Sequence, residues 1–271
     1  MDVTGTADSG RATTARIYDY LLGGKQNFPA DREAARQLLQ ALPQAADMAV
    51  SNRLFLQRAV RVLAEAGIRQ FLDLGSGIPT QGNVHETAQS IAPDSRVLYV
   101  DIDPVAVVAS NEILIDNPHC HAVQADLTHP QLILDALTDS DLATVIDLDQ
   151  PTALIYCSVL HMIPDRVTDV VAPIRDRLVP GSAIVISHAS ADVTDLFGEL
   201  SVSAAKGIYR TQAATEVTAR TDEEIMALFG DMTLMPPGLV PLSDWRPELS
   251  DPDPYASTPT RSPMHGAVAT R

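Results

Sequence analysis

The sequence is poor in cysteine and has no long hydrophobic run. Cys120 and Cys157 are its two cysteines, too few to indicate a disulfide framework or a clustered zinc site. No apolar stretch reaches the roughly 18 to 20 residues of a membrane-spanning helix, and the first residues lack the basic start and apolar core of a signal peptide. We therefore expect a cytoplasmic protein in a reducing compartment, with no membrane partner.

Basic residues are scarce relative to acidic ones. The 271 residues include 19 lysines and arginines against 35 aspartates and glutamates, a formal net charge of −16. Residues 71–271 hold 28 of the acids and 10 of the basic residues. Because phosphate binding needs clustered lysine and arginine, this imbalance argues against a nucleic acid partner. The arginines nearer the N-terminus could bind an anion or form the solvated faces of helices; they are Arg53, Arg58, Arg61 and Arg69.

Apolar runs and helix-like segments alternate through the middle of the chain. The apolar runs cover residues 70–74, 97–100, 120–123, 152–157 and 182–187. The helix-like segments between them cover about 79–91, 104–116, 130–138 and 165–179. This alternation predicts an α/β fold with a doubly wound, mostly parallel sheet and helices on both faces. No group of acids and histidines has the spacing of metal ligands, so no metal is expected.

The region before the first strand has a helical pattern throughout. The periodicity predicts a short helix that stops at Gly23, a helix with Asp31 as its N-cap, and a long helix over about 47–66. We therefore divide the chain into a helical N-terminal extension, residues 1–67, and an α/β domain, residues 68–271.

The region after the fifth strand is harder to interpret. Thr221 with Glu224 forms a capping box, which predicts a short helix. The remaining segments are assigned from composition: a helix over 192–206, strands over 238–242 and 265–269, and a proline-rich extended loop over 246–263.

The most informative motif lies where the first strand ends. Residues 71–77 read Phe-Leu-Asp-Leu-Gly-Ser-Gly, so Asp73 is followed by a turn with Gly75 and Gly77. The next strand also ends in an acid, Asp101. Glycine allows a sharp turn and a close approach to a ligand, and an acid at the second strand end can accept hydrogen bonds from ribose hydroxyls. The pattern predicts a pocket for an adenosine-containing cofactor; the alternative is a strand-to-helix turn with no ligand.

The same motif discriminates between two classes of cofactor. The dinucleotide-binding pattern needs a third glycine for close helix packing, and Thr80 stands at that position. A nicotinamide-dependent oxidoreductase is therefore disfavoured. The D-x-G-x-G pattern instead resembles the first motif of class I S-adenosylmethionine-dependent methyltransferases, and the order of strand-end motifs resembles theirs over residues 68–190. This resemblance implies a class I, Rossmann-like fold with a seven-stranded sheet, and S-adenosyl-L-methionine as the cofactor.

The class I resemblance implies roles for further residues. Asp126 and Leu127 follow the third strand, where members of this class bind the adenine. Asp126 could equally cap the helix that starts near Pro130. The residues expected to bind the cofactor are Asp73, Gly75, Ser76, Gly77, Asp101, Ile102, Asp126, Leu127, Cys157, Ser158 and Lys25.

A narrower resemblance covers almost the whole chain. Residues 18–28, with 31–33 after them, resemble the opening signature of a bacterial family of S-adenosylmethionine-dependent methyltransferases long catalogued as being of unknown function. Residues 71–86 resemble its cofactor motif, and 245–247 resemble a late motif. The resemblance implies a methyltransferase but supplies no substrate. The proline-rich segment before the last predicted strand departs from the usual tail of the family and leaves the position of that strand open.

Two histidines follow strands at the expected substrate end of the sheet. His161 comes after the fourth strand and His188 after the fifth. An unperturbed histidine pKa of ~6.5 suits a general base, so both are candidates for catalysis; the alternative is a histidine packed on the sheet and bonded to a backbone carbonyl. We predict methyl transfer to an oxygen or nitrogen of a small-molecule acceptor. The alternative is a non-catalytic protein that binds S-adenosylmethionine or S-adenosylhomocysteine.

The N-terminal signature contains a second group of polar residues. Tyr18, Tyr20, Lys25 and Asn27 surround a glycine-hinged segment that could fold over the cofactor as a lid and contact the substrate. Lys25 is one of two lysines in the chain, and its expected partner is the cofactor carboxylate or a substrate anion. The alternative is a helix that packs on the core with Tyr20 buried.

Overall fold

The computed structural model describes residues 10–79, 82–139, 141–248, 252–256, 258 and 261–271. Its centre is an eight-stranded sheet in the order β3-β2-β1-β4-β5-β8-β6, with β7 also paired to β8. Strands β1 to β5 are mutually parallel, and β8 runs antiparallel to β5. The strands are β1 (Gln70–Leu74), β2 (Arg96–Asp101), β3 (Cys120–Gln124), β4 (Thr152–Cys157), β5 (Ala183–Ala189), β6 (Thr233–Leu234), β7 (Val240–Pro241) and β8 (Met264–Thr270).

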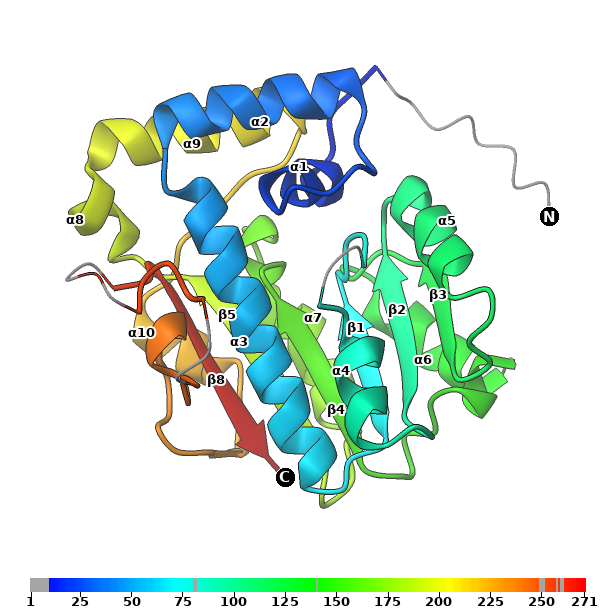
Figure 1. The fold of residues 1–271 in the computed structure, drawn as a ribbon. Coiled ribbons are helices and arrows are strands. Elements are labelled where there is room, and N and C mark those ends of the chain that lie inside the picture. Colours follow the sequence, from blue (N-terminus) through cyan, green and yellow to red (C-terminus); the bar gives the residue numbers. More distant parts are fainter. Residues whose placement is uncertain (1–9, 80–81, 140, 249–251, 257, 259–260) are drawn as a thin grey trace.

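Helices cover both faces of this sheet and one of its ends (Figure 1). The α-helices are α1 (Thr14–Leu21), α2 (Pro29–Ala41), α3 (Ala45–Glu65), α4 (Val84–Ile91), α5 (Pro104–Ile113), α6 (Pro130–Asp139), α7 (Val167–Arg175), α8 (Val193–Phe197), α9 (Glu199–Gln212) and α10 (Asp222–Ala227). Short 3-10 turns are η1 (Asp141–Thr144), η2 (Leu160–Met162) and η3 (Leu242–Asp244).

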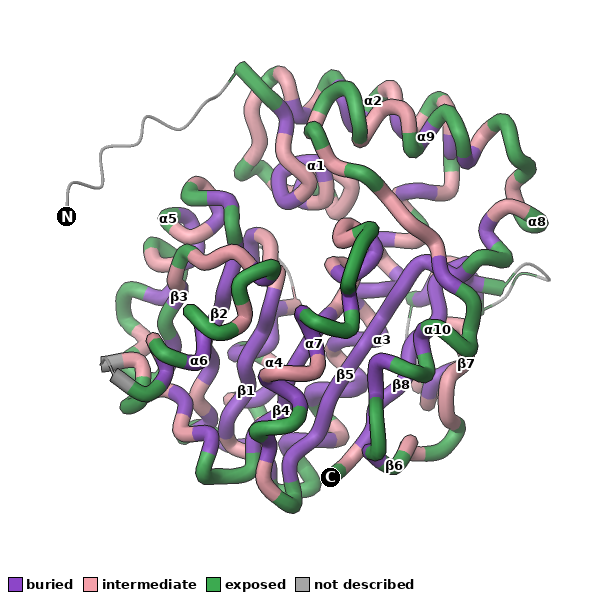
Figure 2. The backbone as a smooth tube through the Cα atoms, turned by 180° about the vertical axis from the view of Figure 1, so that it is seen from behind, coloured by how far each residue is buried: buried purple, intermediate pink, exposed green. Residues whose placement is uncertain are grey.

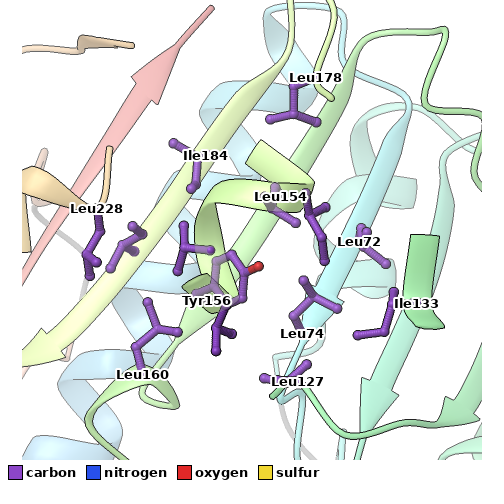
Figure 3. Close-up of a cluster of buried hydrophobic side chains, with 14 of the residues drawn as sticks. Leu72, Leu74, Leu127, Ile133, Leu154, Tyr156, Leu160, Leu178, Ile184 and Leu228 are labelled. Atoms are coloured by element: carbon purple, nitrogen blue, oxygen red, sulfur yellow. The ribbon is translucent and has the colours of Figure 1, made fainter. Parts of the chain in front are cut away.

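The central strands are buried on both faces, as Figure 2 shows for the sheet seen from behind. Successive side chains point to opposite faces, so Leu72 and Leu74 join one cluster and Phe71 joins the other. The first cluster packs against α6, α7 and α10 and includes Tyr156 of β4 (Figure 3). The second packs against α3 and α4 and includes Trp245, whose ring meets Phe55 edge-on. Because α3 carries that apolar stripe, it belongs to the layer that covers the sheet.

A third layer lies beyond the carboxyl ends of the parallel strands. Helices α1, α2 and α9 pack together there through small and aliphatic side chains, among them Ile17, Ala34, Leu38 and Ala205. Figure 1 shows α2 and α9 side by side above α1, with α3 running from this layer down the face of the sheet. We call α1, α2 and α9 the helical cover. It leaves the strand ends facing a roofed space.

One local prediction is confirmed and two are corrected. The capping box of Thr221 with Glu224 starts α10 as expected. Asp31 is not an N-cap, because α2 begins earlier, at Pro29; Asp31 stands at the third position of the helix and accepts from the Phe28 N–H. The predicted helix over 192–206 is broken into α8 and α9 at Gly198, which has a φ of +82°.

The sheet has eight strands where seven were expected. The five parallel strands and the last strand lie where the sequence placed them. Beyond β8, however, the sheet continues as two pieces, β6 and β7, of two residues each. Strands this short leave no alternating pattern in the sequence, and β6 was missed for that reason. The proline-rich 246–263 segment lies partly outside the described residues.

Two further properties bear on the class of protein. Within the described residues, no helix is long and apolar enough to cross a membrane. In the same part of the chain, no three histidine, cysteine or acidic side chains gather as a metal site would require.

Candidate active site

A cavity of about 420 Å³ lies between the carboxyl ends of the strands and the helical cover. Its floor comes from the segments after β1, β2, β3 and β4. Its roof comes from α1, α2, the start of α3, α9 and the extended segment after α9. The cavity therefore has a wall made by strand ends and a wall made by helices.

The glycine turn after β1 forms the centre of the strand-end wall. Gly75 and Gly77 have φ angles of +74° and +63°, where residues with a Cβ are strained. A Cβ on Gly75 would lie 2.2 Å from a methyl carbon of Val159, which also lines the cavity. The N–H groups of Gly75 and Ser76 both donate to the Val100 carbonyl, which ties the turn to β2. Only glycine fits the tightest point of this wall.

Asp101 ends β2 and faces the same turn. One carboxylate oxygen accepts from the Gly77 N–H at 2.7 Å and the other from the Asp103 N–H at 2.8 Å. Burial raises the pKa of Asp101 to about 6, against the opposing effect of those hydrogen bonds. The group is therefore ionised at neutral pH, and each oxygen keeps a lone pair for a further donor.

Asp126 combines the two roles that the sequence left open. It lines the cavity together with Leu127. Its carboxylate also accepts from the backbone N–H and the hydroxyl of Thr128, which closes a local turn before α6. Burial raises its pKa, but these bonds and the neighbouring His129 outweigh burial and leave the pKa below its ordinary value.

A buried acid and a buried arginine both line the cavity. Asp73, at the end of β1, is 4% exposed, and burial raises its pKa to about 7; Arg53 opposes this shift and Asp101 adds to it. Arg53 projects from α3 and its guanidinium carbon lies 5.6 Å from the centre of the Tyr18 ring. Next to it, Asn52 donates to the Tyr18 hydroxyl and accepts from the Ser187 hydroxyl, linking α1, α3 and β5.

The two candidate histidines have different environments. His161, in η2, lines the cavity, and its Nδ1 is buried without a hydrogen-bond partner. Burial, with His188 and Arg220 nearby, lowers the pKa of His161 to about 3. His188 lies outside the cavity lining and is fully buried. Its Nε2 accepts from Arg220 at 2.8 Å, so its Nδ1 carries the proton and donates to the Ala189 carbonyl.

Most of the residues expected to bind the cofactor lie together. The strand-end residues that line the cavity as a group are Asp73, Gly75, Ser76, Gly77, Asp101, Ile102, Asp126, Leu127, Cys157 and Ser158. Tyr18 lines it too, whereas Tyr20 and Asn27 do not. Lys25 is exposed and also lies outside the lining. Asn27 instead donates to Asp19 and to the Gly24 carbonyl, which folds the glycine-hinged loop onto itself.

Several polar lining residues were not among the expected site residues, including Arg53, Lys206 and Tyr209. For Arg53 and Arg58 the sequence left two alternatives, binding an anion or lying on a solvated helix face; both are buried, so neither lies on a solvated face. The sequence could have indicated Arg53 as a site residue, because Asn52 and Arg53 are adjacent polar residues within a mostly apolar part of α3. Lys206 and Tyr209 come from α9, and nothing in the sequence indicated that this helix reaches the cavity.

The cover is held to the strand ends by a buried ionic network. Arg16 of α1 contacts Asp31 at 3.0 Å and Asp103 at 3.6 Å. Thr13 donates from its hydroxyl to Asp103 and from its backbone to Asp31. Because Asp103 also donates its N–H to Asp101, the network joins the cover to the acid at the end of β2.

Comparison with known proteins gives one consistent family. The model of a family described as S-adenosyl methyltransferase matches residues 3–271. A candidate methyltransferase from Thermobifida fusca YX is 39% identical, over 98% of this chain and 97% of its own, with a TM-score of 0.86. A DUF574 family protein from Streptomyces avermitilis MA-4680 is 35% identical, over 98% and 99% of the two chains, with a TM-score of 0.88.

A more distant structure shares the fold. An O-methyltransferase family protein from Burkholderia thailandensis is 13% identical and has a TM-score of 0.51, over 88% of this chain and 62% of its own. No curated protein matches the chain.

Proposed function

The chain belongs to the S-adenosyl methyltransferase family and is an S-adenosylmethionine-dependent methyltransferase, and we propose that its acceptor is a small molecule methylated on oxygen or nitrogen. The observation that carries the proposal is the cavity with two unlike walls. Acids and glycines form the strand-end wall, and aliphatic side chains such as Leu21, Leu38, Leu42 and Met48 form much of the cover wall.

The strand-end wall fits the cofactor. The ionised, buried Asp101 has lone pairs for two ribose hydroxyls. Gly75 and Gly77 line the cavity, and nothing lies within 4 Å of a Cβ built on Gly77, so a ligand can approach the backbone of this turn closely. Ile102 and Leu127 offer apolar surface for the adenine, and Asp126 a carboxylate for its amino group. When bound, S-adenosylmethionine supplies an electrophilic methyl group on a sulfonium.

His161 is proposed to orient the acceptor. Its pKa of about 3 keeps the ring neutral at physiological pH, so it is a weak base. The unpartnered Nδ1 can nevertheless accept a hydrogen bond from an acceptor O–H or N–H, which aligns a lone pair of that atom for in-line attack. Tyr209, whose pKa burial raises to about 12, adds a neutral hydroxyl to the cavity lining. His188 has both nitrogens engaged and is left with a structural role.

The roof restricts the size of the acceptor. The cavity of about 420 Å³ lies beneath packed helices, and the chain around it is strongly acidic. Both features favour a small molecule with an apolar body over a nucleic acid. Helices α1, α2 and α9 would exclude water from the sulfonium and the nucleophile.

Methyl transfer can be tested without knowing the acceptor. The protein would be incubated with methyl-labelled S-adenosylmethionine and a set of phenols, hydroxy acids and amines. We expect S-adenosylhomocysteine to form together with a labelled low-molecular-weight product. Label that enters only protein or RNA, with none in any small molecule, would contradict the proposed acceptor class.

A further inference from the structure

Five of the described arginines are buried, and four of them have clear partners. Arg16 pairs with Asp31, and Arg58 donates to the carbonyls of Trp245 and Leu242. Arg175 donates to the Leu228 carbonyl. Arg220 donates to three backbone carbonyls, those of Leu160, Ile163 and Pro164. This is the expected pattern, because a buried guanidinium is stable only when its charge and donors are matched.

Arg53 is the exception. It is 9% exposed, and its buried Nε has no hydrogen-bond partner. No carboxylate of the described residues lies within 4.0 Å of its guanidinium nitrogens, and the guanidinium lies over the face of the Tyr18 ring. A charged group buried in this way lacks its counter-ion. Since Arg53 lines the cavity, a ligand can supply the missing anion.

Asp73 indicates which charged groups that ligand carries. Its side chain is buried in the same lining, and it accepts no hydrogen bond from the described residues. Arg53 influences Asp73 electrostatically without forming an ion pair with it. A buried guanidinium and a buried carboxyl group held apart in this way complement an α-amino acid head, with the ligand carboxylate toward the guanidinium and the ligand ammonium toward the carboxyl group, which ionises beside that cation.

We propose that Arg53 binds the carboxylate at the amino-acid end of the cofactor, while Asp73 faces its ammonium group. This rests on the proposed function, because it takes the adenosine end to lie at Asp101 and the glycine turn. It assigns to Arg53 the role that the sequence suggested for Lys25. Neighbouring Asn52 holds this face of α3 in place through Tyr18 and Ser187.

Two ligands allow binding of the amino-acid end to be measured separately from binding of the adenosine end. S-adenosylhomocysteine carries both, and 5′-methylthioadenosine keeps the adenosine and the thioether but lacks the amino acid. Their affinities would be measured by titration calorimetry for the unaltered protein, Arg53→Gln and Arg53→Lys. Arg61→Gln is the matched control, because Arg61 is on the same helix and is exposed in an ion pair with Glu248.

Arg53→Gln should lower the affinity for S-adenosylhomocysteine by about 10- to 100-fold and change the affinity for 5′-methylthioadenosine by less than about twofold. Arg53→Lys should recover part of the lost affinity for S-adenosylhomocysteine. Arg61→Gln should leave the affinities for both ligands unchanged. Equal losses for both ligands, or no loss for S-adenosylhomocysteine, would overturn the assignment; in the second case the anion would belong to the acceptor. If the unaltered protein binds neither ligand, the cofactor site itself is wrong.

Discussion

The two walls of the cavity are built by different means. In the strand-end wall, the backbone sets the shape: positive-φ glycines and an acid held by two N–H groups lie within a few residues of strand ends. In the cover wall, side-chain packing between distant helices sets the shape, and the connection to the strand ends is the Arg16 network. The first wall offers charge and backbone, which suit the cofactor. The second offers mostly apolar surface, which suits a variable acceptor.

The largest effect is expected in the strand-end wall. Gly75→Ala places a Cβ at 2.2 Å from Val159 and forces alanine into a left-handed φ. We expect a loss of more than about 3 kcal/mol of unfolding free energy and no measurable binding of S-adenosylhomocysteine. Urea unfolding and calorimetry would check this. Gly207→Ala, inside α9 with open space around its Cβ, is the matched control and should be neutral or stabilising.

The link between the walls should be the next most sensitive point. Arg16→Met leaves Asp31 and Asp103 buried without their cation, which should cost about 3 kcal/mol of unfolding free energy. Arg36→Met, which removes an exposed ion pair on α2, should cost less than about 0.5 kcal/mol. Similar losses from the two substitutions in urea unfolding would show that the network does not hold the cover.

Asp73 should make the free protein less stable as the pH rises. Its pKa is about 7 in the folded protein and 3.8 ordinarily, so the folded state favours the protonated acid. That stability is fully present below pH 4 and is lost as the pH rises through 7. Asp73→Asn should therefore raise the unfolding free energy relative to the unaltered protein by about 2 kcal/mol more at pH 8 than at pH 5. A difference that does not change with pH would contradict the raised pKa.

The smallest effect is expected at Lys25. Its exposed side chain lies outside the cavity lining, so Lys25→Ala should leave the affinity for S-adenosylhomocysteine within about twofold. A tenfold loss in calorimetry, as the sequence alone would suggest, would place the signature loop back in the site.

The contrast between the walls also explains what the sequence could predict. Asp73, the glycines and Asp101 were identified because strand ends and tight turns are local features with few solutions. The same holds for the capping box at Thr221. These features fix the fold class and the strand-end wall. The edge strand β6, with two residues, was too short to leave such a pattern, whereas β7 lies within the strand predicted over 238–242.

The cover wall could not be predicted in the same way. Lys25 and Arg53 are both cations near the N-terminal signature, and composition does not say which one turns inward. That depends on how α3 docks on the sheet and on Asn27, which bonds to Asp19 and keeps its loop away from the cavity. Tyr209 enters the site only because α9 packs on α2, about 170 residues earlier in the chain.

The most direct test of the two-wall account is amide hydrogen exchange with and without S-adenosylhomocysteine. We expect slower exchange at Gly75 to Gly77 and at Ile102 to Asp103, where the strand-end wall would contact the cofactor, and a smaller change at residues 205–217 of the cover wall. Protection confined to residues 205–217, with none at the glycine turn or after β2, would contradict the account.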